Sequence, residues 1–227
     1  YLGLSSPVNP FLKWQLTDTY NVGIESSMWN GLLGVELDVF YMKTTRSLES
    51  QSANFPPSLG SYYPTYINYG SHDNRGFELV LSHNNHIRDF TYHVRGNLSW
   101  ARNKVLKMTE DANVPDYKRA TGGPMGRYWG FVADGLFQSE EEIRNYPVNL
   151  DGNNNRTLLP GDFIYKDVNG DGIINGMDER PIGYPEGWAP IMSFGGNIGL
   201  QWKGIDLNID LSGGAMQGWR QNYELAN

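Results

Sequence analysis

Apolar and polar side chains alternate with a period of two over most of this chain, and helical periodicity is nearly absent. Such alternation places apolar residues on one face of a strand and polar residues on the other. The clearest stretch sets Ile205, Leu207, Ile209 and Leu211 against Asp206, Asn208, Asp210 and Ser212. The pattern predicts an all-β chain with six strands, at residues 12–28, 33–48, 74–83, 90–107, 190–202 and 205–216.

The predicted strands are long, and their connections alternate between short and long. Globular strands usually have about 5–6 residues, whereas several of these exceed ten. Short turns are expected at Asn30-Gly31, at residues 85–89 and at Lys203-Gly204. Long connections fall at residues 49–73 and 108–189. Outer-membrane barrels have this asymmetry, so we expect antiparallel strands of a large transmembrane β-barrel with long extracellular loops.

The faces of these strands also suit a membrane. The apolar faces at residues 77–81, 92–100 and 205–211 carry no charge, as lipid-facing strands require. Asp18 falls on an apolar face, which fits only if it lies near the rim. Aromatic residues stand near strand ends, where a membrane girdle places them: Trp14, Trp29, Tyr41, Trp100 and Trp202. The alternative is that these rings border an ordinary soluble core.

Composition excludes several functional classes. The chain has no cysteine, which rules out disulfides, thiolate catalysis and Cys-ligated metal sites. Its 227 residues carry a net charge of −7, whereas nucleic-acid partners need a basic surface. No Ser nucleophile elbow or phosphate-binding glycine loop is present, and the loop carboxylates show no catalytic pattern. We therefore expect no enzyme and no nucleic-acid partner.

The long segment at residues 108–189 contains the sharpest local motif, a calcium-type loop at residues 167–178. Gly172 stands at loop position 6, where the chain must turn sharply. Oxygen donors stand at positions 1, 3, 5, 7, 9 and 12, which are Asp167, Asn169, Asp171, the Ile173 carbonyl, Asn175 and Asp178. A calcium ion needs 6–8 oxygens, so the spacing predicts a structural Ca²⁺ site that orders the outer loop.

Two features depart from the EF-hand form of this motif. Asp178 stands where an EF-hand has Glu, and flanking helices are not expected. The alternative is an Asx-rich turn without metal, because Asn and Asp stabilise such turns through local side-chain hydrogen bonds.

Aromatic residues in the predicted outer loops are candidates for ligand binding. They are Tyr62, Tyr63 and Tyr66 in the first long loop, and Tyr128 and Trp129 in the second. Exposed aromatic clusters stack on sugars or peptide side chains. The alternative is that the tyrosine cluster packs its own loop.

Four motifs resemble, in order, those of the SusC/RagA-type TonB-dependent outer-membrane transporters. They are Asn9–Trp14 with Thr19–Gly23, Asn74–Leu79, Tyr128–Phe131 with Asp134–Ser139 and Glu142-Ile143, and Gly161–Phe163 with Tyr165–Asp178, Arg180 and Ile182-Gly183. Gln15 departs from the Glu that the family often has there.

The resemblance implies a barrel of about 22 strands with a separate plug domain. Residues 1–107 would supply four strands, residues 108–189 an extracellular segment, and residues 190–227 two further strands of a truncated C-terminal portion. The family imports glycan or peptide fragments through the bacterial outer membrane with a SusD-like surface lipoprotein, and TonB acts through the missing N-terminal part. An alternative from the residues alone is a secreted, calcium-stabilised β-domain that binds carbohydrate.

Overall fold

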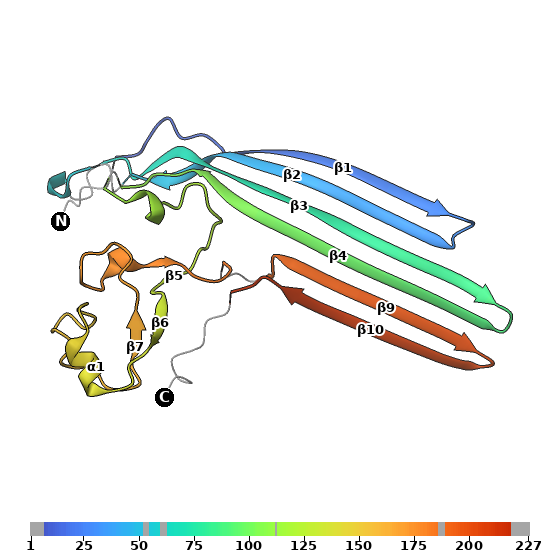
Figure 1. Ribbon diagram of the computed structural model, residues 1–227. Coiled ribbons are helices and arrows are strands. Elements are labelled where there is room, and N and C mark those ends of the chain that lie inside the picture. Colours follow the sequence, from blue (N-terminus) through green and yellow to red (C-terminus); the bar gives the residue numbers. More distant parts are fainter. Residues whose placement is uncertain (1–6, 52–54, 60–62, 112, 186–188, 219–227) are drawn as a thin grey trace, which may run out of the picture.

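A computed structural model places six long strands side by side in one antiparallel sheet (Figure 1). It describes residues 7–51, 55–59, 63–111, 113–185 and 189–218. The strands are β1 (Leu16–Met28), β2 (Leu33–Ser50), β3 (Tyr66–Ile87), β4 (Phe90–Lys107), β9 (Met192–Trp202) and β10 (Ile205–Ala215). Their order is β1-β2-β3-β4-β9-β10. The all-β prediction and its antiparallel pairing are confirmed.

Several strand boundaries differ from the predictions, by one or two residues at the end of β2, the start of β9 and the end of β10, and by four or more at both ends of β3 and at the start of β1. β3 begins at Tyr66 rather than at residue 74, so the expected loop at 49–73 is shorter. Its first part pairs with the end of β2 across register shifts near Ser47, which the alternation does not reveal. β1 begins at Leu16 rather than at residue 12, and the side chain of Asn68 instead bonds the backbone of Lys13 at 2.6 and 2.7 Å.

The strand register gathers the apolar residues on one face, here called the outward face. Two rows that bound this face are Phe90–Trp202–Ile205 near the short turns and Val39–Phe77–Trp100 towards the other end. Within the described strands, no Asp, Glu, Lys or Arg stands on the outward face between these rows. Phe90 and Trp100 are about ten residues apart, which at about 3.4 Å per residue and a tilt of about 45° spans about 24 Å.

The position of Asp18 agrees with the expectation that it lies near the rim. Its register partner is Lys43, one step beyond the Tyr20–Tyr41 pair, whose rings are 6.4 Å apart. That row lies outside the uncharged band. A carboxylate is therefore not forced into the apolar part of the sheet.

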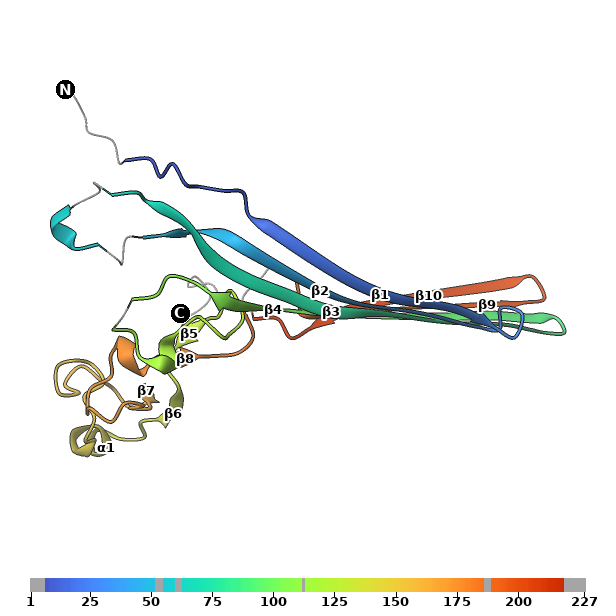
Figure 2. The same cartoon turned by 90° about the horizontal axis from the view of Figure 1, so that it is seen from above.

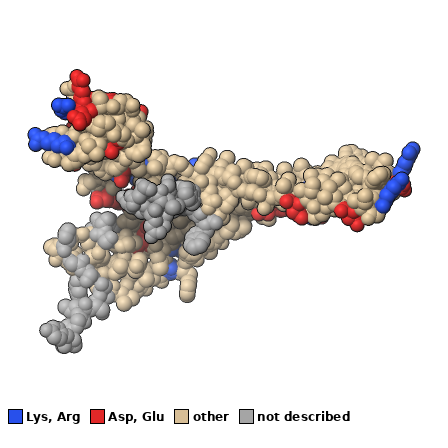
Figure 3. Space-filling model, turned by 90° about the horizontal axis from the view of Figure 1, so that it is seen from below, with Lys and Arg blue, Asp and Glu red and all other residues tan. Residues whose placement is uncertain are grey.

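The opposite face of the sheet, here called the inward face, is polar and mostly acidic. Alongside the uncharged band, it carries one arginine, Arg95, and six carboxylates: Glu25, Glu36, Asp38, Glu78, Asp206 and Asp210. In Figure 3, acidic atoms follow one margin of the sheet, cationic atoms stand at its tip, and the broad surface between is neutral. The two faces thus differ in both polarity and charge.

Residues between β4 and β9 form a small module at the end of the sheet remote from the short turns (Figures 1 and 2). The module holds two strand pairs, of which β5 (Trp129–Gly130) pairs with β8 (Arg180–Pro181) and β6 (Ala133–Leu136) with β7 (Phe163–Tyr165). It also holds helix α1 (Glu140–Asn145) and the 3-10 turns η3 (Asp116–Lys118) and η4 (Gly176–Asp178). A further 3-10 turn, η2 (Pro57–Leu59), lies between β2 and β3. Among the described helices, none has the length and hydropathy needed to cross a bilayer.

The module has its own small core. Phe137 and Ile143 are 1% and 4% exposed, and the ring of Phe137 meets that of Tyr146 edge-on at 5.2 Å. Ser139 caps α1 by accepting from the backbone N–H of Glu142. The Glu142 carboxylate accepts from Gln138 N instead of from the cap residue. This core makes the segment an ordered unit.

Replacing Phe137 by alanine should unfold the module while the sheet persists. Loss of a buried phenylalanine costs about 3–5 kcal/mol, and the module has little other core. Hydrogen exchange of residues 130–165 should accelerate in the full-length protein, with that of β1–β4 unchanged. Phe163→Ala is the matched control, because Phe163 is 55% exposed; equal exchange in the two variants would contradict the assignment of the core.

Candidate functional site

The calcium-type loop is folded around the side chains that the sequence singles out. The two carboxylate oxygens of Asp167 accept from Gly170 N at 2.7 Å and from Gly172 N at 2.8 Å. Asn169 accepts from Asp171 N, and Asp171 accepts from Ile173 N at 2.9 Å. Gly170 and Gly172 have φ values of 77° and 80°, the left-handed region that favours glycine. The loop therefore closes through local side-chain hydrogen bonds.

Asp178, at loop position 12, is completely buried. It accepts from the backbone N–H groups of Val168 at 2.9 Å and of Asn175 at 2.9 Å, and more weakly from Asn169 at 3.5 Å. Burial by itself raises the pKa of this carboxyl. The backbone donors and the nearby Arg180 outweigh burial and hold the pKa below its ordinary value. Asp178 thus joins the two ends of the loop as a carboxylate.

The oxygen atoms of this loop are of the chemical type that hard cations bind. Asp167, Asp171 and Asp178 supply carboxylate oxygens, and Asn169 and Asn175 supply amide oxygens. Each carboxylate oxygen that accepts a single N–H keeps a further lone pair, whereas Asp178 Oδ1 accepts from both Val168 N and Asn169 N. In the described chain, no group of three or more His, Cys, Asp or Glu side chains gathers as a metal site. A cation here would depend on amide and carbonyl oxygens as well as carboxylates.

A second loop, which none of the sequence motifs indicated, is built in the same way around Asp151. One oxygen of Asp151 accepts from Asn153 N and Asn155 N, and the other accepts from Thr157 N and Thr157 Oγ1. Burial opposes charge here, but these hydrogen bonds dominate and lower the pKa of Asp151. The spacing Asp151-x-Asn153-x-Asn155-x-Thr157 was the signal available in the sequence.

The two loops contact each other through Asn149. Its backbone N–H donates to the Gly172 carbonyl at 2.8 Å, and its carbonyl accepts from Ile174 N at 2.9 Å. The calcium-type loop is also tied to η3, because Tyr117 donates to the Met177 carbonyl at 2.6 Å and Lys118 lies 3.2 Å from Glu179. These contacts connect the calcium-type loop to the Asp151 loop and to η3.

The candidate aromatic residues do not form one cluster. Tyr62 lies outside the described residues, and Tyr63 stacks on Phe55 with ring centroids 4.6 Å apart, so it packs within its own loop. Tyr66 opens β3 and is 51% exposed. Trp129 belongs to β5 and has Arg127 over its ring at 5.9 Å. Tyr128 lines a cavity.

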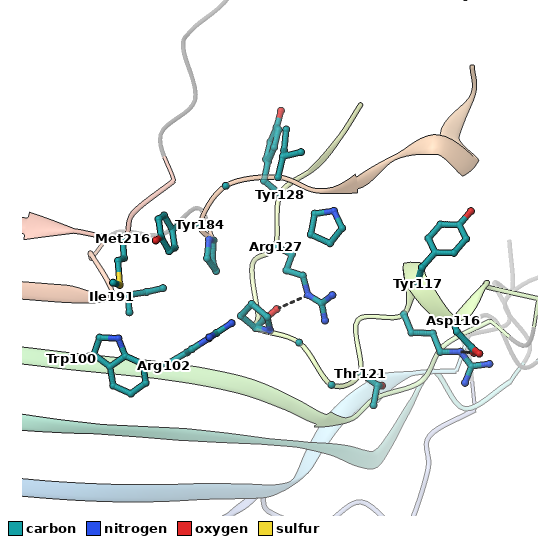
Figure 4. A pocket seen from close by; sticks show the side chains of 18 residues that line it. Trp100, Arg102, Asp116, Tyr117, Thr121, Arg127, Tyr128, Tyr184, Ile191 and Met216 are labelled. Carbon is teal, nitrogen blue, oxygen red and sulfur yellow. Dashed lines mark hydrogen bonds and ion pairs between the residues drawn. The ribbon is translucent and has the colours of Figure 1, made fainter. Parts of the chain in front are cut away.

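This cavity, of about 510 Å³, lies between β4 and the module (Figure 4). Trp100 and Arg102 line it from β4, and Arg127 enters it from the segment above, where Tyr128 also belongs to the lining. Arg119, also in the lining, pairs with Asp116 at 3.2 Å. Arg127 donates to the Ala120 carbonyl at 2.9 Å. The lining therefore combines aromatic rings with three guanidinium groups, none of which the sequence motifs singled out.

Known proteins with similar sequences and folds identify the family. Residues 2–188 match the family described as TonB dependent receptor-like, beta-barrel. TonB-dependent receptor P26 of Formosa agariphila is 29% identical over 93% of this chain and 21% of its own length. TonB-dependent receptor SusC of Bacteroides thetaiotaomicron is 28% identical over 79% of this chain and 19% of its own.

Solved structures support the same architecture. The RagAB peptide transporter superposes with a TM-score of 0.62 at 20% identity, over 92% of this chain and 22% of that one. The RagAB peptide importer in its open-open state gives 0.65 at 19% identity. The chain thus spans about a fifth of the length of these relatives.

The chain belongs to the TonB-dependent receptor β-barrel family. The resemblance to SusC/RagA-type proteins is confirmed, and with it the outer-membrane location. The outward face of the sheet is therefore the lipid-facing wall, and the inward face lines the barrel. Family membership replaces the alternative of a secreted β-domain. The strand number of the whole barrel stays a prediction.

Acid should loosen the module at pH values below the ordinary aspartate pKa of about 3.9. The pKa values of Asp178 and Asp151 are depressed in the folded state, so their stabilisation is complete above that value. It is lost as the pH falls through their folded pKa values. Pepsin should cleave residues 140–185 of the full-length protein faster, relative to an unstructured reference peptide, at pH 2.5 than at pH 4.5.

Asp178→Asn and Asp151→Asn should raise cleavage at pH 4.5 and flatten this pH dependence. Asp134→Asn, a change at an exposed residue of β6, is the matched control and should behave like the unmodified protein. Cleavage that stays constant relative to the reference peptide down to pH 2.5 would show that neither carboxylate stabilises the module.

Proposed function

We propose that this chain is part of a TonB-dependent transporter that imports glycan or peptide fragments across the outer membrane. The observation that carries this proposal is the uncharged band of the outward face, joined to a polar inward face in a chain of this family. The uncharged band can contact lipid acyl chains, and the polar inward face can line an aqueous pathway for a solute. The relatives are receptors and transporters, and we propose no enzymatic activity for this chain.

The charge of the inward face narrows the class of solute. Six carboxylates against Arg95 repel polyanions at the wall, since like charges in a confined lumen are costly. A side-chain network continues this polar lining, in which His93 contacts Asn197 at 2.6 Å and Asn197 donates to Asp210 at 2.6 Å. Neutral oligosaccharides and neutral or basic peptides fit this lining best. The similar RagAB structures are described as a peptide transporter, which favours a solute of that class.

A surface lipoprotein of the SusD type is the proposed partner at the outer end, and TonB the proposed partner on the periplasmic side. The two-component name of the RagAB structures supports an assembly with a second protein. The ordered module between β4 and β9 supplies a structured outer surface for such a contact, whereas the other end of the sheet consists of tight turns.

A structural calcium ion is the proposed cofactor. Asp167, Asn169, Asp171, the Ile173 carbonyl, Asn175 and Asp178 would hold it, and the ion would stiffen the loop that leads into β8. This loop is tied to η3 by Tyr117 and Lys118, so its order would extend to the cavity wall at Tyr117. Its contribution would be to stability rather than to signalling, since no helix pair flanks it.

Uptake in the bacterium that encodes the protein tests the transport proposal. Deletion of the full-length gene should abolish uptake of one class of labelled oligosaccharide or oligopeptide, and the restored gene should rescue it. A restored gene without its TonB-interacting segment should bind the solute at the cell surface and fail to import it. Equal uptake of every solute tested, with and without the gene, would refute the proposal.

Chelation tests the calcium proposal separately from transport. Removing calcium from the full-length protein with EGTA should increase hydrogen exchange in residues 165–180, and calcium, but not magnesium, should restore protection. Asp171→Asn should weaken this response because it removes an expected ligand on an exposed part of the loop. Asp134→Asn is the control. Exchange that is indifferent to EGTA would leave the loop as a metal-free Asx turn.

A further inference from the structure

Four cations lie just beyond the uncharged band on the outward, lipid-facing side of the sheet. Arg75 and Arg102 are direct register partners, one step beyond Phe77 and Trp100. Lys43 and Lys104 flank Asp73 in the next row. We call Lys43, Arg75, Arg102 and Lys104 the cationic belt. It lies on the module side of the band, away from the short turns (Figure 1).

The belt lacks partners for its charges within the described chain. No hydrogen bond or ion pair joins any of its four side chains to another described residue. Arg75 and Arg102 stand directly opposite each other, an arrangement of like charges that destabilises a sheet. The two carboxylates on this side, Asp18 and Asp73, leave an excess of cations. An external anion would relieve this repulsion.

The charges of the sheet are segregated between its two faces, which distinguishes the cationic belt from an ordinary solvent-exposed surface. Acidic residues dominate the inward face, while the cations collect on the outward face in two adjacent register rows. One step along the strand is about 7 Å, so the belt lies where a lipid headgroup follows the acyl chains. Guanidinium groups bind phosphate with two parallel hydrogen bonds, and ammonium groups bind it as point charges.

The cavity beside β4 provides an enclosed binding space next to Arg102, at one end of the cationic belt. Arg102 points into it, and Arg127 approaches from the opposite wall (Figure 4). Trp100 provides an aromatic floor at the edge of the uncharged band. A lipid headgroup in this cavity would contact the guanidinium groups of Arg102 and Arg127. The acyl chains of the same lipid would contact the ring of Trp100. This combination fits an anchored lipid better than a freely diffusing anion.

We propose that the cationic belt binds the phosphate groups of the outer-leaflet lipid, with Arg102 and the adjoining cavity holding one phosphorylated headgroup. Each phosphate pairs with two or more of these cations, which have no partner within the described chain. The binding fixes the height of the barrel wall in the membrane and supports the module against the bilayer surface. It requires only the outer-membrane location and is independent of the transported solute.

Lipid binding to the purified full-length protein tests the proposal. The probe is fluorescent lipid A in detergent, compared with lipid A from which the phosphates have been removed. The protein should bind the phosphorylated form at least about tenfold more tightly, with affinity falling as salt rises. The combined variant Lys43→Gln, Arg75→Gln, Arg102→Gln and Lys104→Gln should lose this difference between the two lipids.

Two controls make the result decisive. Arg95→Gln removes a cation from the inward face of the same strand and should leave lipid binding unchanged. Inorganic phosphate at the concentration of lipid phosphate should not compete. Equal binding of the two lipids by the unmodified protein would overturn the proposal without any variant, and so would an equal loss in Arg95→Gln. Full competition by inorganic phosphate would show a site for soluble anions instead of lipid.

Discussion

The register of the antiparallel strands is the constraint on which the rest of this structure depends. Most apolar residues of the outward face have apolar partners on the neighbouring strands, as in the row Val39–Phe77–Trp100. Because side chains alternate strictly, a slip of one residue would move Glu78 and Arg95 into the lipid-facing wall. Burying such charges in a bilayer costs several kcal/mol, so the membrane itself selects this register.

The same register produces the charge asymmetry of the wall. Inward positions collect carboxylates beside the network of His93, Asn197 and Asp210, which suits an aqueous pathway. Outward positions are uncharged until Arg75 and Arg102, where cations appear together. A single alternating pattern thus defines a solute-facing lining, a lipid-facing band and a headgroup-level belt.

The module between β4 and β9 uses a different source of order. Its core is small, with Phe137 and Ile143 as its buried apolar residues among those described. Asp151 and Asp178 organise its loops further by accepting several backbone N–H groups each. The backbone of Asn149 then joins the two carboxylate-centred loops. Ionised carboxylates therefore stabilise the module where apolar surface is scarce.

The sequence by itself determined the strands, the short turns and the spacing of the calcium-type loop, because these depend on residues close together in the chain. It did not show that β3 begins at Tyr66, since the polar residues there lack alternation and pair across a bulge. It also did not reveal the belt. Lys43, Asp73 and Lys104 are distant in sequence, and only the cross-strand hydrogen bonds bring them into one row.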